Sequence, residues 1–324
     1  GIVGPLLVLF ATSVFGTRTI REAVNTAKTG LRNEAYEANQ LAASFAARTH
    51  EGQIELYFHL AEDEASSPEM VVAVREMLET PQIERALDAV VALRTPAATH
   101  NDNAFKAQIL ESPKYVELVR VLQQRLRHYT GNGGGSRTRL ATMFVTDGRG
   151  TILGTAYEDK SLTSNPGRNF AFRTYFHGES EDKPKDSTLI QDVRPINRTH
   201  LSAAFQSAST HLWKVAVSTP IYCTDDRDRP DAMFVATINL GDIDLLQGED
   251  NHVAVLVDAR EGRHQGTILQ HPLLDVRRRV GALSGEKFQM PARLVDLLLN
   301  SGDDVDYVDP LASAADGEEF SGPW

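Results

Sequence analysis

The feature that most constrains the fold is a long stretch without proline, from Thr17 to about Asp63. Along it, apolar residues recur every three or four positions, which is the period of an α-helix. They are Ile20, Val24, Ala27, Leu31, Ala35, Ala38, Leu41, Ala42, Phe45, Ile54, Phe58 and Ala61. The spacing predicts one helix of roughly forty residues or more. Its small side chains allow two arrangements, pairing with the same helix of a second chain or packing on the chain's own sheet domain.

The residues before this stretch are apolar. Residues 1–17 include no charged side chain, and the first charge is Arg18. At about 1.5 Å per residue, a helix over such a run nearly crosses a hydrocarbon core of about 30 Å. We expect the end of a transmembrane helix here, and a chain that is a fragment of a longer protein. A signal-peptide core is the alternative, opposed by the lack of a basic segment before the run and of a clear cleavage site.

Helix-start signals follow at two points. Ser67 precedes Pro68 and Thr80 precedes Pro81, so each pair joins a capping residue to a proline in the first turn. Helices are expected over 68–78, 81–93, 103–110 and 113–129. The glycine-rich run 131–136 then forms a loop. A phosphate-binding loop is not expected there, because no strand precedes the run and no Lys-Ser/Thr follows it.

After this loop the pattern changes to the alternation of half-buried strands. Strands are expected over 140–146, 151–157, 187–192, 201–208, 212–222 and 232–240, the last as a central strand, with a tight turn at 147–150. A shorter second set covers 252–258 and 267–270, followed by a helix over 292–299. These elements predict an α+β fold, in which a long N-terminal helix precedes antiparallel sheet units and the second unit is incomplete.

Composition excludes several classes of function. A net charge of −11 argues against nonspecific nucleic-acid binding, because no basic stripe is present to neutralise phosphates. The single cysteine, Cys223, excludes an internal disulfide and leaves the compartment open. The acidic residues within 302–309 lack the glycine and terminal glutamate of a calcium loop, so a solvated loop is expected there and no metal site.

Motifs of catalysis are also missing. The chain contains no HExxH, no Gly-x-Ser-x-Gly, no cysteine pair for zinc and no dinucleotide fingerprint. His177, His200 and His211 are expected to be surface or loop residues. We therefore predict neither enzymatic activity nor a cofactor for this fragment.

The stretch 165–222 concentrates the residues suited to ligand binding. Arg173 lies within a few residues of the rings of Phe172, Tyr175 and Phe176. A planar guanidinium can hold a carboxylate with two hydrogen bonds while aromatic walls exclude water. The alternative is that Arg173 is a structural salt-bridge partner and that the rings belong to the core.

The run 172–176, followed by 202–205 and the strand 213–221, resembles the ligand-binding half of double Cache (dCache) sensor domains. The resemblance covers most of residues 18–324. It implies two PAS-like units on a long membrane-anchored helix, with the membrane-distal unit binding a small molecule outside the cytoplasm. The implied division is the end of a membrane helix (1–17), a stalk helix (18–63), a distal unit (64–250) and a partial proximal unit (251–324).

The resemblance also implies residue roles. Arg173 would hold an anionic group of the ligand, Tyr175 would donate a hydrogen bond or form a wall, and Phe176 would stack on the ligand. The implied ligand-binding set is completed by Arg168, Ser202, Phe205 and Ser207. The amino-acid-binding members carry an aspartate near the position of Ser207, so a carboxylate or another small anion is expected here rather than a free α-amino acid.

The predicted function is that of an extracytoplasmic, periplasmic sensing domain of a bacterial inner-membrane receptor. The expected partners are a carboxylate or amino-acid-like small molecule, the membrane, and a second copy in a homodimer, but no nucleic acid. A cytoplasmic kinase domain in the full-length protein is compatible with this prediction. Ligand would close loops around Arg173 and shift the sheet against the long helix. The alternative is a ligand-free spacer or dimerisation module.

Overall fold

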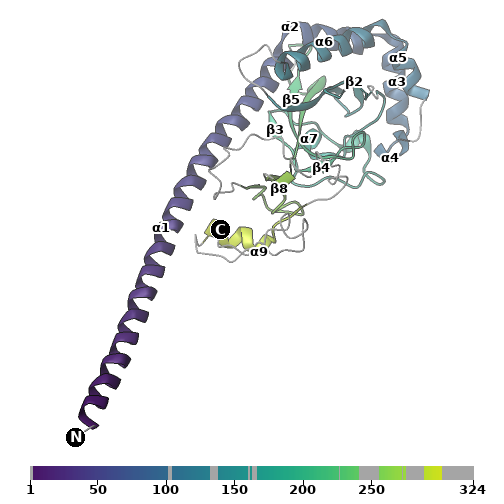
Figure 1. Cartoon of the computed structure of the whole chain (residues 1–324). Coiled ribbons are helices and arrows are strands. Elements are labelled where there is room, and N and C mark those ends of the chain that lie inside the picture. The colour runs from purple at the N-terminus through teal and green to yellow at the C-terminus, as the bar shows by residue number, and fades with distance from the viewer. Residues whose placement is uncertain are drawn as a thin grey trace.

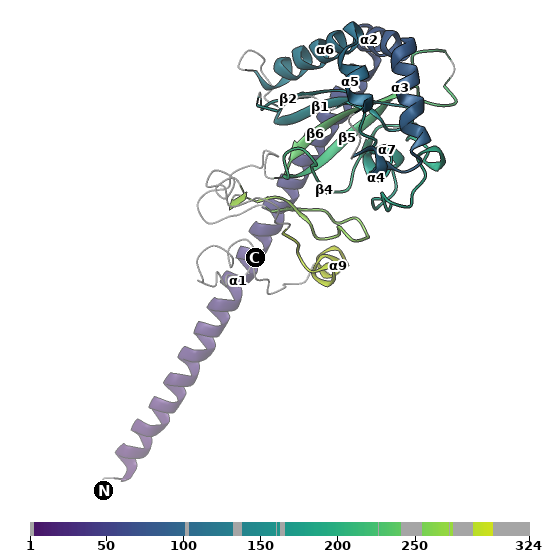
Figure 2. The ribbon, with the colours of Figure 1, turned by 90° about the vertical axis from the view of Figure 1, so that its right-hand side faces the viewer.

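The computed structural model describes residues 3–100, 104–131, 138–159, 161–162, 166–225, 227–240, 255–271, 273–274 and 288–300. Figures 1 and 2 show a long helix that extends from a body made of a helical layer and an antiparallel sheet. A smaller group of elements lies beyond this sheet, on the side toward which the helix extends. The predicted α+β fold with a long N-terminal helix is therefore confirmed.

The long helix α1 (Val3–Ser66) is 64 residues long and includes the whole of the stretch predicted to be helical. From residue 18 to residue 49 its described side chains are almost all exposed, whereas His50, Tyr57, Leu60 and Ala61 are buried. The helix thus packs on its own sheet domain over its last turns, against β5, β6 and α2. The rest of it projects from the body (Figure 1).

In the described part of the chain, we find no helix with the length and apolarity that a membrane crossing requires. The predicted membrane segment, residues 1–17, lies outside the residues whose side chains the structure describes.

Among the described residues, five helices follow α1 before the sheet: α2 (Pro68–Leu78), α3 (Pro81–Ala92), α4 (Pro96–Thr99), α5 (Ala104–Leu110) and α6 (Pro113–Thr130). Ser67 caps α2 as predicted, since its hydroxyl accepts a hydrogen bond from the Met70 N–H at 3.3 Å. Thr80 stands at the same place before α3, but its hydroxyl donates to the Glu76 carbonyl at 2.7 Å instead. The short helix α4 was not predicted.

The main sheet consists of β1 (Leu140–Asp147), β2 (Ile152–Tyr157), β3 (His200–Leu201), β4 (Phe205–Gln206), β5 (Trp213–Ile221) and β6 (Ala232–Asn239). Its order is β2-β1-β6-β5-β3, with β4 also paired to β5, and every pairing is antiparallel. The prediction that 232–240 is a central strand is confirmed, because β6 lies between β1 and β5.

One strand prediction is wrong, and another is wrong in part. The segment 187–192 contains a 3-10 helix, η1 (Ile190–Asp192), and no strand, since the Ile190 N–H bonds to the Arg94 carbonyl rather than to a sheet neighbour. Instead of one strand over 201–208, the chain forms two short strands, β3 at His200–Leu201 and β4 at Phe205–Gln206. Ser202 separates them, because its hydroxyl accepts the Ala216 N–H of β5 in place of a strand carbonyl.

The turn between β1 and β2 forms where Asp147 and two glycines predict it. One carboxylate oxygen of Asp147 accepts the N–H groups of Arg149 and Thr151, at 3.1 and 2.7 Å. Gly150 has φ 85°, and a Cβ on it would lie 2.8 Å from the backbone of Ala171. Only glycine fits this close approach without strain.

The two faces of the sheet bury different partners. Met143 and Val145 of β1 face the helical layer, while Phe144 between them faces an aromatic cluster on the other side. This aromatic cluster comprises Phe144, Phe170, Phe172, Tyr175, Phe176 and Phe205. It is covered by the loop that carries α7 (Thr174–His177), below the sheet in Figure 2.

The second unit is described in part. Its elements are a two-stranded antiparallel sheet of β7 (Leu256–Val257) and β8 (Ile268–Gln270), and the helix α9 (Ala292–Asn300). The strand predicted over 252–258 is thus shorter, and residues 252–254 lie outside the described ones. The acidic stretch 302–309 also lies outside them.

Candidate functional site

A pocket of about 530 Å³ opens beside Arg173. Its walls come from the loop after α7, from β4 and the turn that follows it, from the start of β5, and from the second unit. The lining residues are Arg173, Glu181, Asp182, Ala204, Phe205, Gln206, Ser207, Ala208, His211, Trp213, Arg263 and His264. The pocket therefore lies where the second unit meets the main sheet.

Arg173 is held firmly at the edge of this pocket. Its Nη1 donates to Asp182 Oδ2 at 2.6 Å, and its Nη2 donates to the Gln206 carbonyl at 3.0 Å. The guanidinium carbon lies 4.9 Å from the ring centroid of Phe172 and 5.1 Å from that of Phe205. The side chain is 16% exposed, and its Nε is buried without a hydrogen-bond partner. A ligand would thus meet an oriented guanidinium that is already paired with a carboxylate.

Local sequence explains why Arg173 takes this position. It precedes α7 in an extended conformation, and Gly178, with φ 74°, ends this short helix. A Cβ on Gly178 would lie 2.7 Å from Cγ2 of Ile196, so both this contact and the positive φ favour glycine there. Asp182 holds the start of α7, since its Oδ1 accepts the Thr174 N–H at 3.0 Å. One carboxylate therefore anchors both the helix and the guanidinium.

The structure brings three of the seven predicted ligand-binding residues to this pocket: Arg173, Phe205 and Ser207. Tyr175 and Phe176 are buried in the aromatic cluster beneath it. The ring of Tyr175 lies 5.4 Å from that of Phe205, and burial raises the pKa of its phenol. These two side chains support the pocket rather than line it.

The other two predicted residues do not line the pocket either. Ser202 is fully buried, and its hydroxyl donates to the Ala203 carbonyl at 2.8 Å and accepts the Ala216 N–H at 2.9 Å. The Arg168 carbonyl accepts the Ile152 N–H at 2.9 Å, which ties its backbone to β2.

Sequence reasoning missed much of the polar lining. Glu181 accepts the Arg263 N–H at 2.7 Å, and with Asp182 it balances the two guanidiniums of the pocket. His211 lines the pocket from a turn in which its φ is 57°. These residues come from separate loops, so no local pattern connects them with Arg173.

Lys214 was also missed, although its position offers a signal. It is 2% exposed and lies on the face of β5 that carries the aromatic cluster, directly opposite Phe205 in register. Its Nζ donates to Thr142 Oγ1 at 3.1 Å. Lysine is rarely fully buried unless it is paired, so a lysine at an inward position of an alternating strand is an unusual feature that the sequence itself shows.

The three histidines named from the sequence differ in setting. His177 Nε2 donates to the Phe172 carbonyl at 3.1 Å, and its Nδ1 accepts the Glu179 N–H at the same distance. Burial lowers the pKa of His177 and lowers that of His200 to about 4, so both rings are neutral at pH 7. Within the described residues, no group of three or more His, Cys, Asp or Glu could hold a metal ion.

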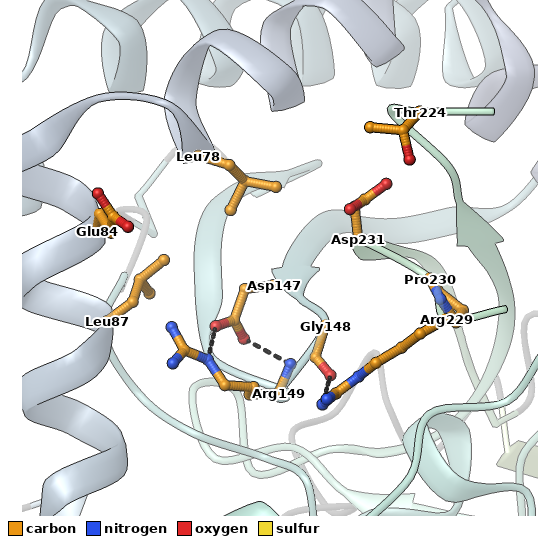
Figure 3. A pocket seen from close by; sticks show the side chains of 10 residues that line it. All are labelled: Leu78, Glu84, Leu87, Asp147, Gly148, Arg149, Thr224, Arg229, Pro230 and Asp231. Carbon is orange, nitrogen blue, oxygen red and sulfur yellow. Dashed lines mark hydrogen bonds and ion pairs between the residues drawn. The ribbon is translucent and has the colours of Figure 1, made fainter. Parts of the chain in front are cut away.

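A second pocket, of about 390 Å³, lies at the other end of the sheet between α2, α3 and the β1–β2 turn (Figure 3). Its guanidiniums are engaged within the protein: Arg149 pairs with Asp147 and Asp88, and Arg229 donates to the Gly148 carbonyl at 3.2 Å. None of the predicted site residues lines it. The pocket beside Arg173 is therefore the candidate functional site.

No family model and no curated protein matches the chain. Among solved structures it is similar to the sensor domain of the V. cholerae histidine kinase DctB, with 14% identity over 82% of this chain and 76% of that chain, at a TM-score of 0.43. It is similar to the ligand-binding domain of the Pseudomonas aeruginosa amino-acid chemoreceptor PctC in complex with GABA, with 16% identity, coverage of 75% and 77%, and a TM-score of 0.36. It is also similar to the sensory domain of the Campylobacter jejuni chemoreceptor Tlp3 with isoleucine bound, with 12% identity, coverage of 81% and 85%, and a TM-score of 0.35.

These solved structures are sensor or ligand-binding domains of a histidine kinase and of chemoreceptors. Similarity at this level assigns no residue role to this chain.

Proposed function

We propose that this chain is a ligand-sensing domain of a transmembrane receptor, and that the pocket beside Arg173 binds a small molecule with a carboxylate or another anionic group. The observation that carries this proposal is the guanidinium of Arg173, which is oriented between two rings at the edge of a pocket of about 530 Å³. A pocket of this size suits a small molecule. An oriented guanidinium suits a carboxylate.

The ligand would share Arg173 with Asp182. The second hydrogens of Nη1 and Nη2 are the donors left for an anionic group. Glu181 offers an acceptor for a hydroxyl or amino group of the same ligand. Because Asp182 also holds the start of α7, any change in its pairing with Arg173 reaches that helix.

The signal would then pass through the sheet to α1, whose last turns pack on β5 and β6. In this proposal residues 1–17 anchor the chain in the inner membrane, units 64–250 and 251–324 lie outside the cytoplasm, and a kinase domain lies elsewhere in the full-length protein. Ligand changes the output only if it binds one arrangement better than the other.

A second candidate function is that of a dimerisation module, favoured by a specific observation. The exposed part of α1 carries an apolar stripe, defined here as Ile20, Val24, Leu31, Leu41 and Phe45, and these residues are 58 to 74% exposed. Their positions fit alternating steps of three and four residues, the spacing that faces a partner helix in a coiled coil. A second copy of this helix is the partner that we propose.

Isothermal titration of the purified chain tests the sensing function. The probes are the dicarboxylates malonate, succinate and glutarate, with acetate and α-amino acids for comparison. We expect at least one dicarboxylate to bind, and Arg173→Gln to weaken that binding about 100-fold. Arg194→Gln is the matched control, because Arg194 is exposed and does not line the pocket.

Three results would contradict the proposal. The first is the absence of carboxylate binding, and the second is tight binding of amino acids without any response to carboxylates. The third is a folded Arg173→Gln variant that binds the probe as the unaltered chain does.

A further inference from the structure

The turn between β7 and β8, residues 258–266, forms one wall of the pocket. It is closed by the hydrogen bond from the Gly266 N–H to the Asp258 carbonyl, at 2.7 Å. Arg263 and His264, near its end, line the pocket. The Arg263 N–H donates to Glu181 at 2.7 Å, and the His264 ring centroid lies 6.5 Å from that of Trp213. This turn, called here the wall turn, is therefore in contact with the main sheet domain.

Arg260 fastens the wall turn to that domain. Its Nη1 donates to the Leu201 carbonyl at 2.7 Å, and its Nη2 donates to the Ser202 carbonyl at 2.8 Å. The same guanidinium pairs with both oxygens of Asp258, at 2.9 and 2.6 Å. The Asp258 side chain is only 4% exposed, so the guanidinium is held from both sides. Arg260 itself does not line the pocket.

The backbone held by Arg260 continues directly into the pocket. Ser202 is followed by Ala203, whose N–H donates to Thr174 Oγ1 at 3.1 Å, and then by Ala204 and Phe205, which line the pocket. Thr174 in turn donates its N–H to Asp182, the carboxylate that pairs with Arg173. One connected set of hydrogen bonds thus links the wall turn to the guanidinium expected to meet the ligand.

We propose that Arg260 is a positioning residue for this pocket: it docks the wall turn, and with it Arg263 and His264, onto the segment that carries the ligand site. This inference rests on the proposed sensing function. Ligand affinity and docking of the wall turn are then coupled, since each favours the other to the same extent. Occupancy of the pocket is in this way communicated to the second unit.

The side chain must be arginine for a geometric reason. Its planar fork reaches two neighbouring carbonyls and a carboxylate at the same time, which a single ammonium on a flexible chain cannot do. Arg260→Lys keeps the charge and loses the fork. Arg260→Met keeps the length of the side chain and loses both.

Hydrogen exchange and titration together test this inference, with malonate, succinate and glutarate as probes. In Arg260→Met without a probe, we expect faster amide exchange at 256–270 and 201–204, and unchanged exchange in β1 and β6. We expect the affinity for the probe that binds best to fall at least tenfold in Arg260→Met and by an intermediate factor in Arg260→Lys. In the unaltered chain, the probe should slow exchange at 256–270.

Arg229→Met is the matched control, because Arg229 is also an exposed arginine bonded to a backbone carbonyl, at the far end of the sheet (Figure 3). It should leave both exchange at 256–270 and probe affinity unchanged. If Arg260→Met does not fold, the same measurements on Arg260→Lys decide the matter.

The two proposals fail differently. If no probe binds the unaltered chain, the sensing function is overturned and this inference falls with it. If a probe binds the unaltered chain and the Arg260 variants with equal affinity, or does not change exchange at 256–270, the positioning role is overturned while the sensing function stands.

Discussion

Replacing Arg173 by methionine removes three kinds of interaction at once. The variant loses the 2.6 Å ion pair with Asp182, the 3.0 Å hydrogen bond to the Gln206 carbonyl, and the stacking of the guanidinium against Phe172 and Phe205. It also leaves the Asp182 carboxylate with its bond from the Thr174 N–H but without the Arg173 guanidinium.

The structure sets the expected size of the effect. A hydrogen bond to a charged group contributes about 1.5 to 3 kcal/mol when it is well buried. The two side chains are 16% and 27% exposed, so partial solvent screening reduces this contribution. We expect Arg173→Met to lower the free energy of unfolding by about 2 to 3 kcal/mol, and the coupling between Arg173 and Asp182 to be about 1 to 2 kcal/mol.

A double-mutant cycle measures this coupling. The variants are Arg173→Met, Asp182→Asn and the double variant, and the free energy of unfolding is obtained from urea denaturation. The matched control is the cycle Lys183→Met and Glu179→Gln, since this pair is four residues apart and Glu179 is 59% exposed. We expect its coupling to be below about 0.5 kcal/mol.

The reasoning would be refuted by a coupling between Arg173 and Asp182 that is no larger than that of the control pair. Arg173 would then not be held by Asp182, and the proposed link from the pocket to α7 would be lost.

Three further predictions follow from single positions. Gly150→Ala should lower the free energy of unfolding by about 2 kcal/mol or more, because the new Cβ would lie 2.8 Å from the backbone of Ala171. Gly52→Ala is the control: a Cβ there has nothing within 4 Å, so the same urea titration should show a free energy of unfolding higher by up to about 1 kcal/mol. Burial lowers the pKa of His200 from 6.5 to about 4, so as the pH falls the unfolded chain takes up a proton on this residue before the folded chain does. Through this group, the free energy of unfolding should decrease by roughly 1 to 2 kcal/mol between pH 7 and pH 4. In His200→Gln, this part of the pH dependence of the free energy of unfolding should be lost. Leu31→Asp should shift the chain toward monomer in sedimentation velocity, while Arg32→Ser should not; equal sedimentation of both variants and the unaltered chain would refute pairing through the apolar stripe.

Local signals predicted those parts of the fold that depend on neighbours in sequence. The Ser67–Pro68 pair starts α2, and Asp147 with its glycines makes the β1–β2 turn, because each contact joins residues within four positions. The long helix follows from its spacing for the same reason. Where Ile190 bonds to the Arg94 carbonyl instead of to a strand, the decisive partner is distant and leaves no pattern in the sequence.

The candidate site was predictable at Arg173 from composition and, through the family resemblance, at Phe205 and Ser207. Arg173 and its rings are close in sequence, so their composition indicates a pocket. Asp182 and Glu181 belong to a loop without periodicity, and Arg263 belongs to the second unit, so no local pattern indicated that they contact the site. Tyr175 and Phe176 were assigned to the ligand by resemblance, yet as consecutive residues of a short helix they fill the space beneath the pocket.

The geometry of α1 has a mechanical consequence. At about 1.5 Å per residue, its 64 residues span about 96 Å. The last stretch of about 25 Å, from His50 onward, packs against the sheet domain. The helix can therefore pivot near His50, and the part that projects from the sheet domain is almost three times as long as the part that packs on it. A tilt that displaces the packed C-terminal end of α1 by about 1 Å would move its projecting N-terminal end by about 3 Å. Rearrangements too small to disturb the packing of the sheet domain would therefore be large at the N-terminal end of the helix.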